Sequence, residues 1–375
     1  MKLKIALLFM TCLYCTGATL AQDNPKGAGI GIEANYMRGQ IYKHTKNFNL
    51  PVSNHVNAYE INFVQQTYGK KPWHRRHGYP LVGIGITLTD YGMNDIYGKC
   101  IGVAPVLQLP IVKYRNFEWT FKVAMGFGYV TKKYERIPGW DTVNNAIGSH
   151  INNYTLFATA LRYHINKHWD VQAGFNFSHA SNASFRRPNL GYNTYGWHIG
   201  ARYFPATSKP GRIEQETEKL KNRWLAQVRF GLAGVEMTAP DGPLYPVYML
   251  SLYGSKRYLS KNKVFAGIDY TYNTNMYAFF RNNEVFVGKE KSESWRSSAF
   301  VGNEFLMGRV GLYLQLGFYV KNYYQSTYWY YQKLGFNIYI LQREKGILKE
   351  LFASTYLKAH GTEAEFAEFG IGCGF

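Results

Sequence analysis

Apolar and polar residues alternate along almost the whole chain after residue 27, and this alternation limits the folds that the chain can adopt. In the stretch FEWTFKVAMGFGYV, residues 117–130, large apolar side chains occupy every second position. Successive side chains of a β-strand point to opposite faces, so a period of two predicts strands. Beyond the N-terminal segment, no apolar run approaches the roughly 18 residues that a membrane-spanning helix requires. The pattern therefore indicates an all-β protein.

The composition narrows the class further. Aromatic residues make up 17% of the chain, with 32 tyrosines, whereas charged residues make up only 18%. A transmembrane β-barrel explains both values, because its outer face is apolar and its two rims carry belts of aromatic side chains. We therefore predict an antiparallel β-barrel of the outer-membrane type.

The alternating segments fall into two sets of eight. We expect the first set at 28–38, 57–69, 79–90, 100–112, 117–130, 152–165, 169–181 and 192–204. The second set is expected at 223–237, 244–258, 263–276, 296–307, 309–320, 328–341, 348–359 and 363–375. Residues 208–222, with Pro, Gly and a charged helical pattern, predict a periplasmic linker with a short helix. The predicted domains are thus a barrel over 22–207 and a second barrel region over 223–375.

Two architectures fit sixteen strands: tandem eight-stranded barrels, or one sixteen-stranded barrel. Many positions on the predicted inner faces are glycine, as in PLVGIGITLTDY, residues 80–91. Small inner residues suit a narrow, filled barrel, because a wide channel does not need them. The tandem arrangement is therefore favoured.

Both ends of the chain have the sequence patterns of targeting signals. Residues 1–21 combine two lysines, an apolar run and a small-residue exit, which predicts a secretory signal peptide. The last residues, FAEFGIGCGF, alternate and end in Phe375, as in the insertion signal of outer-membrane barrels. Only Cys100 and Cys373 then remain in the mature chain, too few for a disulfide scaffold or a cysteine metal site. No motif calls for a cofactor.

The chain is strongly basic. Its formal charge is +19, and removal of the two lysines of the signal leaves 19 − 2 = +17. Such an excess favours polyanionic partners. An exported protein without a nucleic-acid module is not expected to bind nucleic acid, so phosphorylated lipopolysaccharide is the expected partner. The oligomeric state is not predicted.

The stretch NFSHASNASFRRPNLGYN, residues 176–193, carries the clearest cluster of chemically active residues. By the period of two, His179 and Ser181 continue the outward face of their strand, and Asn193 lies on the outward face of the next one. All three are expected at one rim, facing lipid. Polar groups at membrane depth are candidates for a function, although a rim residue can also simply contact headgroup water.

These residues resemble the signature of outer-membrane lipid A 3-O-deacylases, the PagL-like acyloxyacyl hydrolases, in which a His-x-Ser-Asn core precedes a Pro-Asn-x-Gly loop. The resemblance covers roughly residues 28–204 and is sharp over 176–204. It implies an eight-stranded barrel whose site faces the outer leaflet, and an esterase that removes an ester-linked acyl chain from lipid A.

By this resemblance Ser181 is the nucleophile and His179 the general base. The Asn182 side chain and the Ala183 backbone N–H are the expected donors to the oxyanion. The family has an acidic residue about a dozen positions after the serine, where this chain has Asn193. An amide can orient an imidazole but cannot neutralise imidazolium.

Several other acidic and basic residues are candidates for a role at this site. Glu60, Asp90 or Asp170 could supply the missing charge, although Asp170 lies at the opposite end of its strand. Arg186 and Arg187, beside the serine, could bind lipid A phosphates bidentately or be solvated loop charges.

The second half offers no equally clear site. His360 and Thr362 fall where a copy of His179 and Ser181 would lie, but the surrounding motif is absent. The loop residues Gly148 to His150 have no acidic partner at triad spacing and are expected to be surface residues. The alternative to an esterase is a catalytically inactive barrel that binds lipopolysaccharide or forms a pore, and Asn193 favours that alternative.

Overall fold

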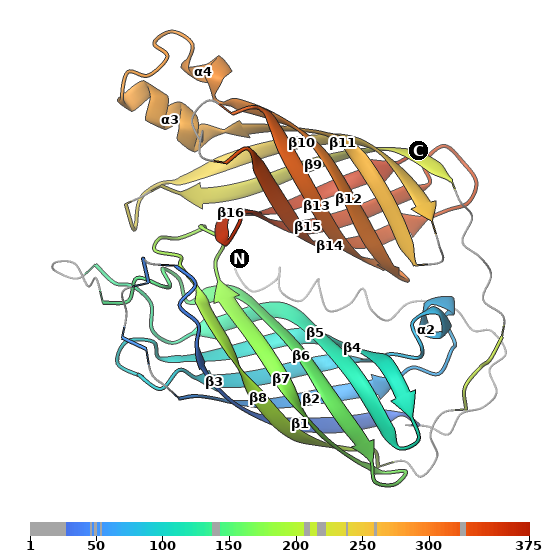
Figure 1. Ribbon diagram of the computed structural model, residues 1–375. Helices are drawn as coiled ribbons and strands as arrows, with labels where there is room; N and C mark the ends of the chain where they lie inside the picture. Colours follow the sequence, from blue (N-terminus) through green and yellow to red (C-terminus); the bar gives the residue numbers. More distant parts are fainter. Residues whose placement is uncertain are drawn as a thin grey trace, which may run out of the picture.

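The chain folds into two closed, antiparallel, eight-stranded barrels, as the computed structural model shows (Figure 1). The structure describes residues 28–375 except 46, 49–50, 53–54, 137–142, 206–210, 216–222, 238, 259–260 and 323–327. The predicted signal peptide, residues 1–21, lies outside the described residues. The tandem architecture is confirmed, and the sixteen-stranded alternative is wrong. None of the described helices has both the length and the apolar composition needed to cross a membrane.

The first barrel follows the chain order, and β8 pairs with β1 to close it. Its strands are β1 (Ile30–Ile41), β2 (Val56–Gln66), β3 (Leu81–Asp90), β4 (Lys99–Tyr114), β5 (Phe117–Val130), β6 (Ile151–His164), β7 (Trp169–Ser181) and β8 (Tyr192–Tyr203). A short helix, α2 (Pro72–Arg76), lies in the β2–β3 connection. The loops that follow β1, β3, β5 and β7 therefore share one end of the barrel, and α2 lies at the other.

The second barrel closes in the same way, through pairing of β16 with β9. Its strands are β9 (Trp224–Glu236), β10 (Leu244–Tyr258), β11 (Asn262–Asn273), β12 (Trp295–Met307), β13 (Val310–Lys321), β14 (Tyr330–Gln342), β15 (Glu350–His360) and β16 (Glu363–Gly374). The strand expected to reach residue 276 ends at Asn273, and helices α3 (Thr274–Asn282) and α4 (Glu290–Glu293) follow it. Burial of Met276 and Phe280 stabilises α3, a contact that strand periodicity does not reveal.

The two faces of each strand differ as the alternation predicts. On β5, Phe127 is 70% exposed on the outside, whereas Lys122 faces the lumen and is buried. Buried charges require partners, and the lumen of the first barrel supplies them: Arg162 lies 3.2 Å from Glu33, and Lys122 pairs with Glu60. In the second barrel Lys263 lies 2.9 Å from Glu350 in a similar network. The lumens are thus filled by paired side chains.

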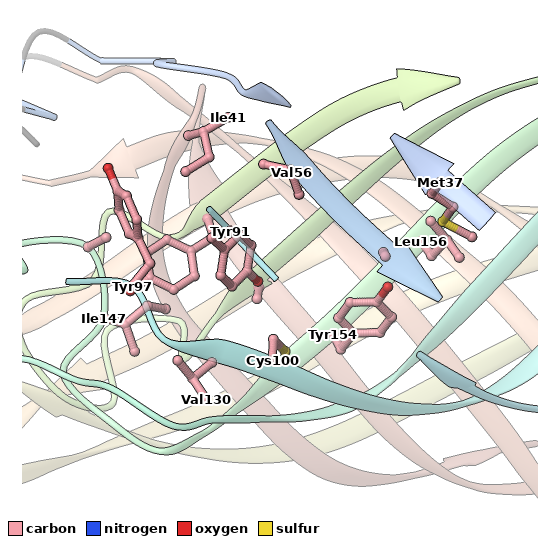
Figure 2. Close-up of a cluster of buried hydrophobic side chains, with 14 of the residues drawn as sticks. Met37, Ile41, Val56, Tyr91, Tyr97, Cys100, Val130, Ile147, Tyr154 and Leu156 are labelled. Carbon is pink, nitrogen blue, oxygen red and sulfur yellow. The ribbon is translucent and has the colours of Figure 1, made fainter. Parts of the chain in front are cut away.

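An apolar cluster closes the first barrel at the end that carries the β7–β8 loop. Tyr91 and Tyr97, from the β3–β4 loop, pack on Tyr192 with ring centroids 4.6 and 5.4 Å away. Figure 2 shows this cluster, in which Ile147 from the β5–β6 loop lies near Tyr97 and Val130. Tyr192 is fully buried, so the start of β8 is firmly packed.

The barrels contact each other at both ends. At one end, the Ser184 hydroxyl donates to the backbone carbonyl of Ala364 over 2.8 Å. At the other, His77 Nε2 lies 3.0 Å from the backbone carbonyl of Leu306. The predicted linker falls between β8 and β9. Residues 211–215 are irregular and the rest of 208–222 lies outside the described residues, so its short helix stays a prediction.

Candidate functional site

Strands β7 and β8 bring the three central candidate residues together. Their register places His179 directly opposite Asn193. His179 Nε2 lies 2.8 Å from Ser181 Oγ, and His179 Nδ1 lies 2.6 Å from Asn193 Oδ1. Both distances are within hydrogen-bond range. A nucleophile, a base and an orienting group therefore form one continuous chain.

The side chains of Ser181, His179 and Asn193 lie on the outward side of the strands, but other residues cover them. Phe175, on the same side of β7, is 71% exposed, whereas Ser181 is only 3% and Asn193 7% exposed. The β7–β8 loop provides part of the cover. A Cβ atom added to Gly191 would lie 3.1 Å from the His179 ring and 3.2 Å from Ser181, and this glycine has φ +79°. Gly191 thus permits the loop to approach closely at a backbone angle that side chains disfavour.

His44, in the β1–β2 loop, adds a fourth residue to this series of contacts. Its Nδ1 atom lies 2.7 Å from Asn193 Nδ2. The sequence gives no sign of this contact, because 149 positions separate the two residues. The amide of Asn193 therefore lies between two imidazole rings, with its oxygen toward His179 and its nitrogen toward His44.

Asn182 and Ala183 form the sharp turn after Ser181. Ala183 and Ser184 have φ of 54° and 63°, values that are uncommon for residues other than glycine and that concentrate at functional sites. The Asn182 backbone N–H donates to Asn189 Oδ1 and its side-chain amide donates to Ser149 Oγ, both over 2.8 Å. One of the two amide hydrogens expected to face an oxyanion is thus bound to Ser149.

Ser149 and Asn189 were not singled out by the sequence. The segment around Ser149 was expected to be surface, yet Ser149 contacts Asn182, and a Cβ on Gly148 would meet the Arg187 carbonyl at 2.3 Å. This segment therefore supports the candidate site from a different loop. Asn189 belongs to the Pro-Asn-x-Gly motif, which was the available signal for it.

Arg186 and Arg187 contact the second barrel. Arg186 Nη1 lies 2.8 Å from Glu236 Oε1, and the Arg187 backbone N–H donates to Glu236 Oε2. Glu236 is the last residue of β9, and its backbone N–H donates to the Ser184 carbonyl over 3.1 Å. The buried carboxylate of Glu236 thus holds Arg186 and Arg187, and its backbone N–H holds Ser184. The sequence did not indicate this role for the second half.

The acidic residues considered as replacements for Asn193 are engaged elsewhere. Glu60 pairs with Lys122 in the lumen. Asp90 lies 3.4 Å from Lys99, and Asp170 lies 2.6 Å from Arg202 at the opposite end of β7. Asn193 is therefore the residue that contacts Nδ1 of His179. Among the described residues, no group of three or more His, Cys, Asp and Glu side chains is arranged to hold a metal ion.

Two family models match this chain. Residues 57–202 match the family described as lipid A 3-O-deacylase (PagL), and residues 222–375 match that described as acyloxyacyl hydrolase, C-terminal domain. No curated protein matches the chain. Among solved structures, a mutant Rh. blastica porin is 11% identical, covers 92% of this chain and 100% of its own, and has a TM-score of 0.21.

A second solved structure, CdiB from Acinetobacter baumannii, is 9% identical, covers 92% of this chain and 60% of its own, and has a TM-score of 0.19. Neither structure superposes closely on this chain. The two family matches, in contrast to these structures, together span most of the chain. One covers the barrel with the His-x-Ser-Asn residues, and the other covers the second barrel. The chain belongs to the family of PagL-like lipid A deacylases, the acyloxyacyl hydrolases.

Proposed function

We propose that the protein is an outer-membrane esterase that uses Ser181 and His179 to remove an ester-linked acyl chain from lipid A at the outer-leaflet rim. The observation that carries this proposal is the contact chain from Ser181 through His179 to Asn193. The outward position of these residues supports it as well, because an acyl chain lying in a membrane would reach them from the outside of the barrel.

The chemistry follows from the contacts. Ser181 Oγ attacks the ester carbonyl while its proton passes to His179 Nε2. The tetrahedral intermediate then collapses, and His179 returns the proton to the leaving sugar oxygen. Water, activated by the same histidine, releases the fatty acid from Ser181. We assign the developing oxyanion to the second Asn182 amide hydrogen and the Ala183 backbone N–H.

Asn193 orients His179 rather than neutralising it. For this, its carbonyl oxygen must accept from Nδ1–H of His179, which leaves Nε2 free to accept the serine proton. An Asn amide can be turned either way, and His44 fixes the choice because its Nδ1 atom accepts from Asn193 Nδ2. Burial lowers the pKa of His44, although hydrogen bonds with the backbone at Tyr42 and Leu190 raise it in part. A neutral His44 can act as this acceptor.

The two arginines contribute in different ways. Arg186 shares its Nη1 with Glu236, so its remaining donors are the ones available for lipid A phosphates. Arg187 donates its backbone N–H to Glu236, and its side chain lines the polar pocket where the two barrels meet. Both stay predicted substrate contacts.

The direct test compares lipid A from cells that express the wild-type protein with lipid A from cells that express Ser181→Ala. Mass spectrometry is expected to show loss of one acyl chain with the wild type and intact lipid A with the variant. Heat-modifiable electrophoretic mobility checks that both barrels fold. Unchanged lipid A in both strains would favour an inactive, lipopolysaccharide-binding barrel, and equal deacylation in both would remove Ser181 from the mechanism.

A further inference from the structure

A polar pocket lies where the second barrel meets the β7–β8 loop of the first. Its volume is about 150 Å³, against the roughly 10–15 Å³ that one water molecule occupies by the same measure. The pocket is therefore large enough for a group of atoms such as a sugar ring. It is lined by Arg187, Val235, Glu236, Asn273, Asn275, Arg296, Tyr328, His360, Glu363, Ala364, Glu365 and Phe366.

The loop that carries the candidate oxyanion donors forms one wall of this pocket. Arg187 belongs to both, and Glu236 holds the loop in place through Arg186 and the backbone N–H of Arg187. Ser184, three residues after Ser181, is bound on the second barrel by Ala364, which also lines the pocket. A ligand in the pocket would thus lie next to the turn that follows the nucleophile.

Apart from Glu365 Oε2, which lies 3.0 Å from Lys358 Nζ, three buried polar atoms at the pocket have no hydrogen-bond partner among the described residues. They are Asn273 Oδ1 and Asn275 Oδ1, which accept, and Arg187 Nε, which donates. Asn273 is only 1% exposed, so bulk water does not readily satisfy its carbonyl oxygen. Buried polar groups left in this state are costly, and a bound polar group is a common reason for them.

The charges around the pocket decide which polar group fits. A phosphate would meet the carboxylates Glu236, Glu363 and Glu365 as well as the guanidinium groups, and an acyl chain would leave the amides unpaired. A hydroxyl both donates and accepts. Several hydroxyls on one ring could pair with amide oxygens on one side and with Arg187 Nε on the other.

We propose that this pocket binds the sugar hydroxyls of the lipid A headgroup while the acyl ester lies at Ser181. The proposal rests on the proposed function and extends it. A 3-O-acyl ester joins the acyl chain to a sugar oxygen, so the saccharide must lie beside the oxyanion turn during attack. The second barrel then selects the substrate through its headgroup, and the first performs the reaction.

The test uses the full chain in detergent with two substrates: lipid A, and a p-nitrophenyl acyl ester that has no sugar. Asn275→Leu removes one free acceptor at the start of α3. The ratio of kcat/KM for lipid A to kcat/KM for the simple ester should fall about tenfold, the size expected for one or two lost hydrogen bonds to a ligand. The fall should come from KM for lipid A.

Two variants control for folding and for the nature of the contact. Asn282→Leu makes the same change at an exposed position of the same helix, and its ratio should match that of the wild type. Asn275→Asp keeps an acceptor oxygen and should restore most of the ratio. An unchanged ratio in Asn275→Leu would overturn the proposal and indicate that the pocket holds only water.

Binding can also be measured without turnover. In the Ser181→Ala protein, a soluble glucosamine disaccharide without acyl chains should bind in calorimetry, and Asn273→Leu should weaken this binding about tenfold. Inorganic phosphate at the same concentration should not compete. Phosphate competition would overturn the assignment to hydroxyls. These results do not depend on catalysis, so a failure of the esterase proposal would show separately, as activity that survives in Ser181→Ala.

Discussion

The seventh strands of the two barrels, β7 and β15, occupy the same place in the barrel order, but the histidines near their ends have different surroundings. His179 lies on the outward side and contacts Ser181 and Asn193. His360, at the mouth of the second lumen, is 4% exposed and its Nε2 lies 2.9 Å from the Tyr319 hydroxyl. An equivalent position in the strand order therefore does not give equivalent chemistry, because the side of the sheet decides what the histidine meets.

The ends of the two barrels near these histidines also differ, because one is apolar and the other is polar. The first is closed by the apolar cluster around Tyr91, Tyr97 and Tyr192, which holds the start of β8 next to Asn193. The second opens into the polar pocket that contains His360 and the unpaired asparagines. A rigid, apolar base suits a group that must be held in one orientation, whereas a polar cavity suits a ligand that enters and leaves.

The largest expected difference is between the two histidines. His179→Ala should lower kcat on lipid A and on the simple ester alike, by roughly 10³-fold, because the general base is lost for both substrates. His360→Phe should act through KM for lipid A, since this side chain lines the pocket and contacts Tyr319 rather than Ser181. Steady-state kinetics per folded barrel measure both, and a kcat loss in His360→Phe as large as that in His179→Ala would erase the distinction.

Asn193 and His44 provide the next test. Asn193→Ala should lower kcat by roughly 10²-fold because the imidazole loses its orienting acceptor, and Asn193→Glu should raise kcat because a carboxylate stabilises imidazolium. His44→Ala should lower kcat about tenfold in the wild-type background, since the amide can then turn its nitrogen toward His179. A carboxylate has two equivalent oxygens, so His44→Ala should have little effect in the Asn193→Glu background.

This double-mutant cycle separates the role of His44 from a general packing role. A packing defect would lower activity by the same factor in both backgrounds. Equal effects of His44→Ala in the two backgrounds would therefore count against amide orientation.

The dependence of activity on pH is expected to show the same contact. Burial lowers the pKa of His44, so the ring is neutral above its ordinary value of 6.5 and gains a proton only as the pH falls further. Once protonated, it can no longer accept from Asn193. Activity should thus be lost on the acid side through protonation of both His44 and His179, and log(kcat/KM) should fall with a slope above one. His44→Gln, which keeps an acceptor oxygen, should reduce the slope to one.

The smallest expected effect concerns the contact between the barrels. Glu236→Gln removes the charge that pairs with Arg186 and weakens the hold on the β7–β8 loop. Loss of one charge-assisted contact that positions a loop should lower kcat about fivefold on both substrates. Asp241→Asn, an exposed change in the next loop, serves as the matched control. Wild-type kcat in Glu236→Gln would show that the second barrel does not position the loop.

Much of the fold could be predicted because strand periodicity is a local signal. The alternation in residues 117–130 survives as β5, with Lys122 inside and Phe127 outside. The glycine-rich inner faces correctly favoured narrow barrels. Helix α3 could not be predicted, because its stability depends on burial of Met276 and Phe280 rather than on a strong helical pattern.

In the candidate site, too, some contacts can be predicted from local sequence patterns and others cannot. The distances among His179, Ser181 and Asn193 follow from the side-chain period and from the pairing of adjacent strands, both of which the sequence carries. His44 and Glu236 come from remote segments, and their contacts depend on how loops fold over the rim and how two barrels meet. Neither has a periodic signal. Gly191 lies within the Pro-Asn-x-Gly motif, but its closeness to the His179 ring depends on how the β7–β8 loop folds back over the strands.

Covalent labelling shows whether the reaction takes place at Ser181 of the first barrel. A fluorophosphonate probe that reacts with activated serines should label the folded wild-type protein once, on the peptide that contains Ser181, and His179→Ala should abolish the label. Peptide mapping by mass spectrometry identifies the position. A label on Ser149 or in residues 223–375, or an active enzyme that takes no label at Ser181, would show that the nucleophile is not Ser181.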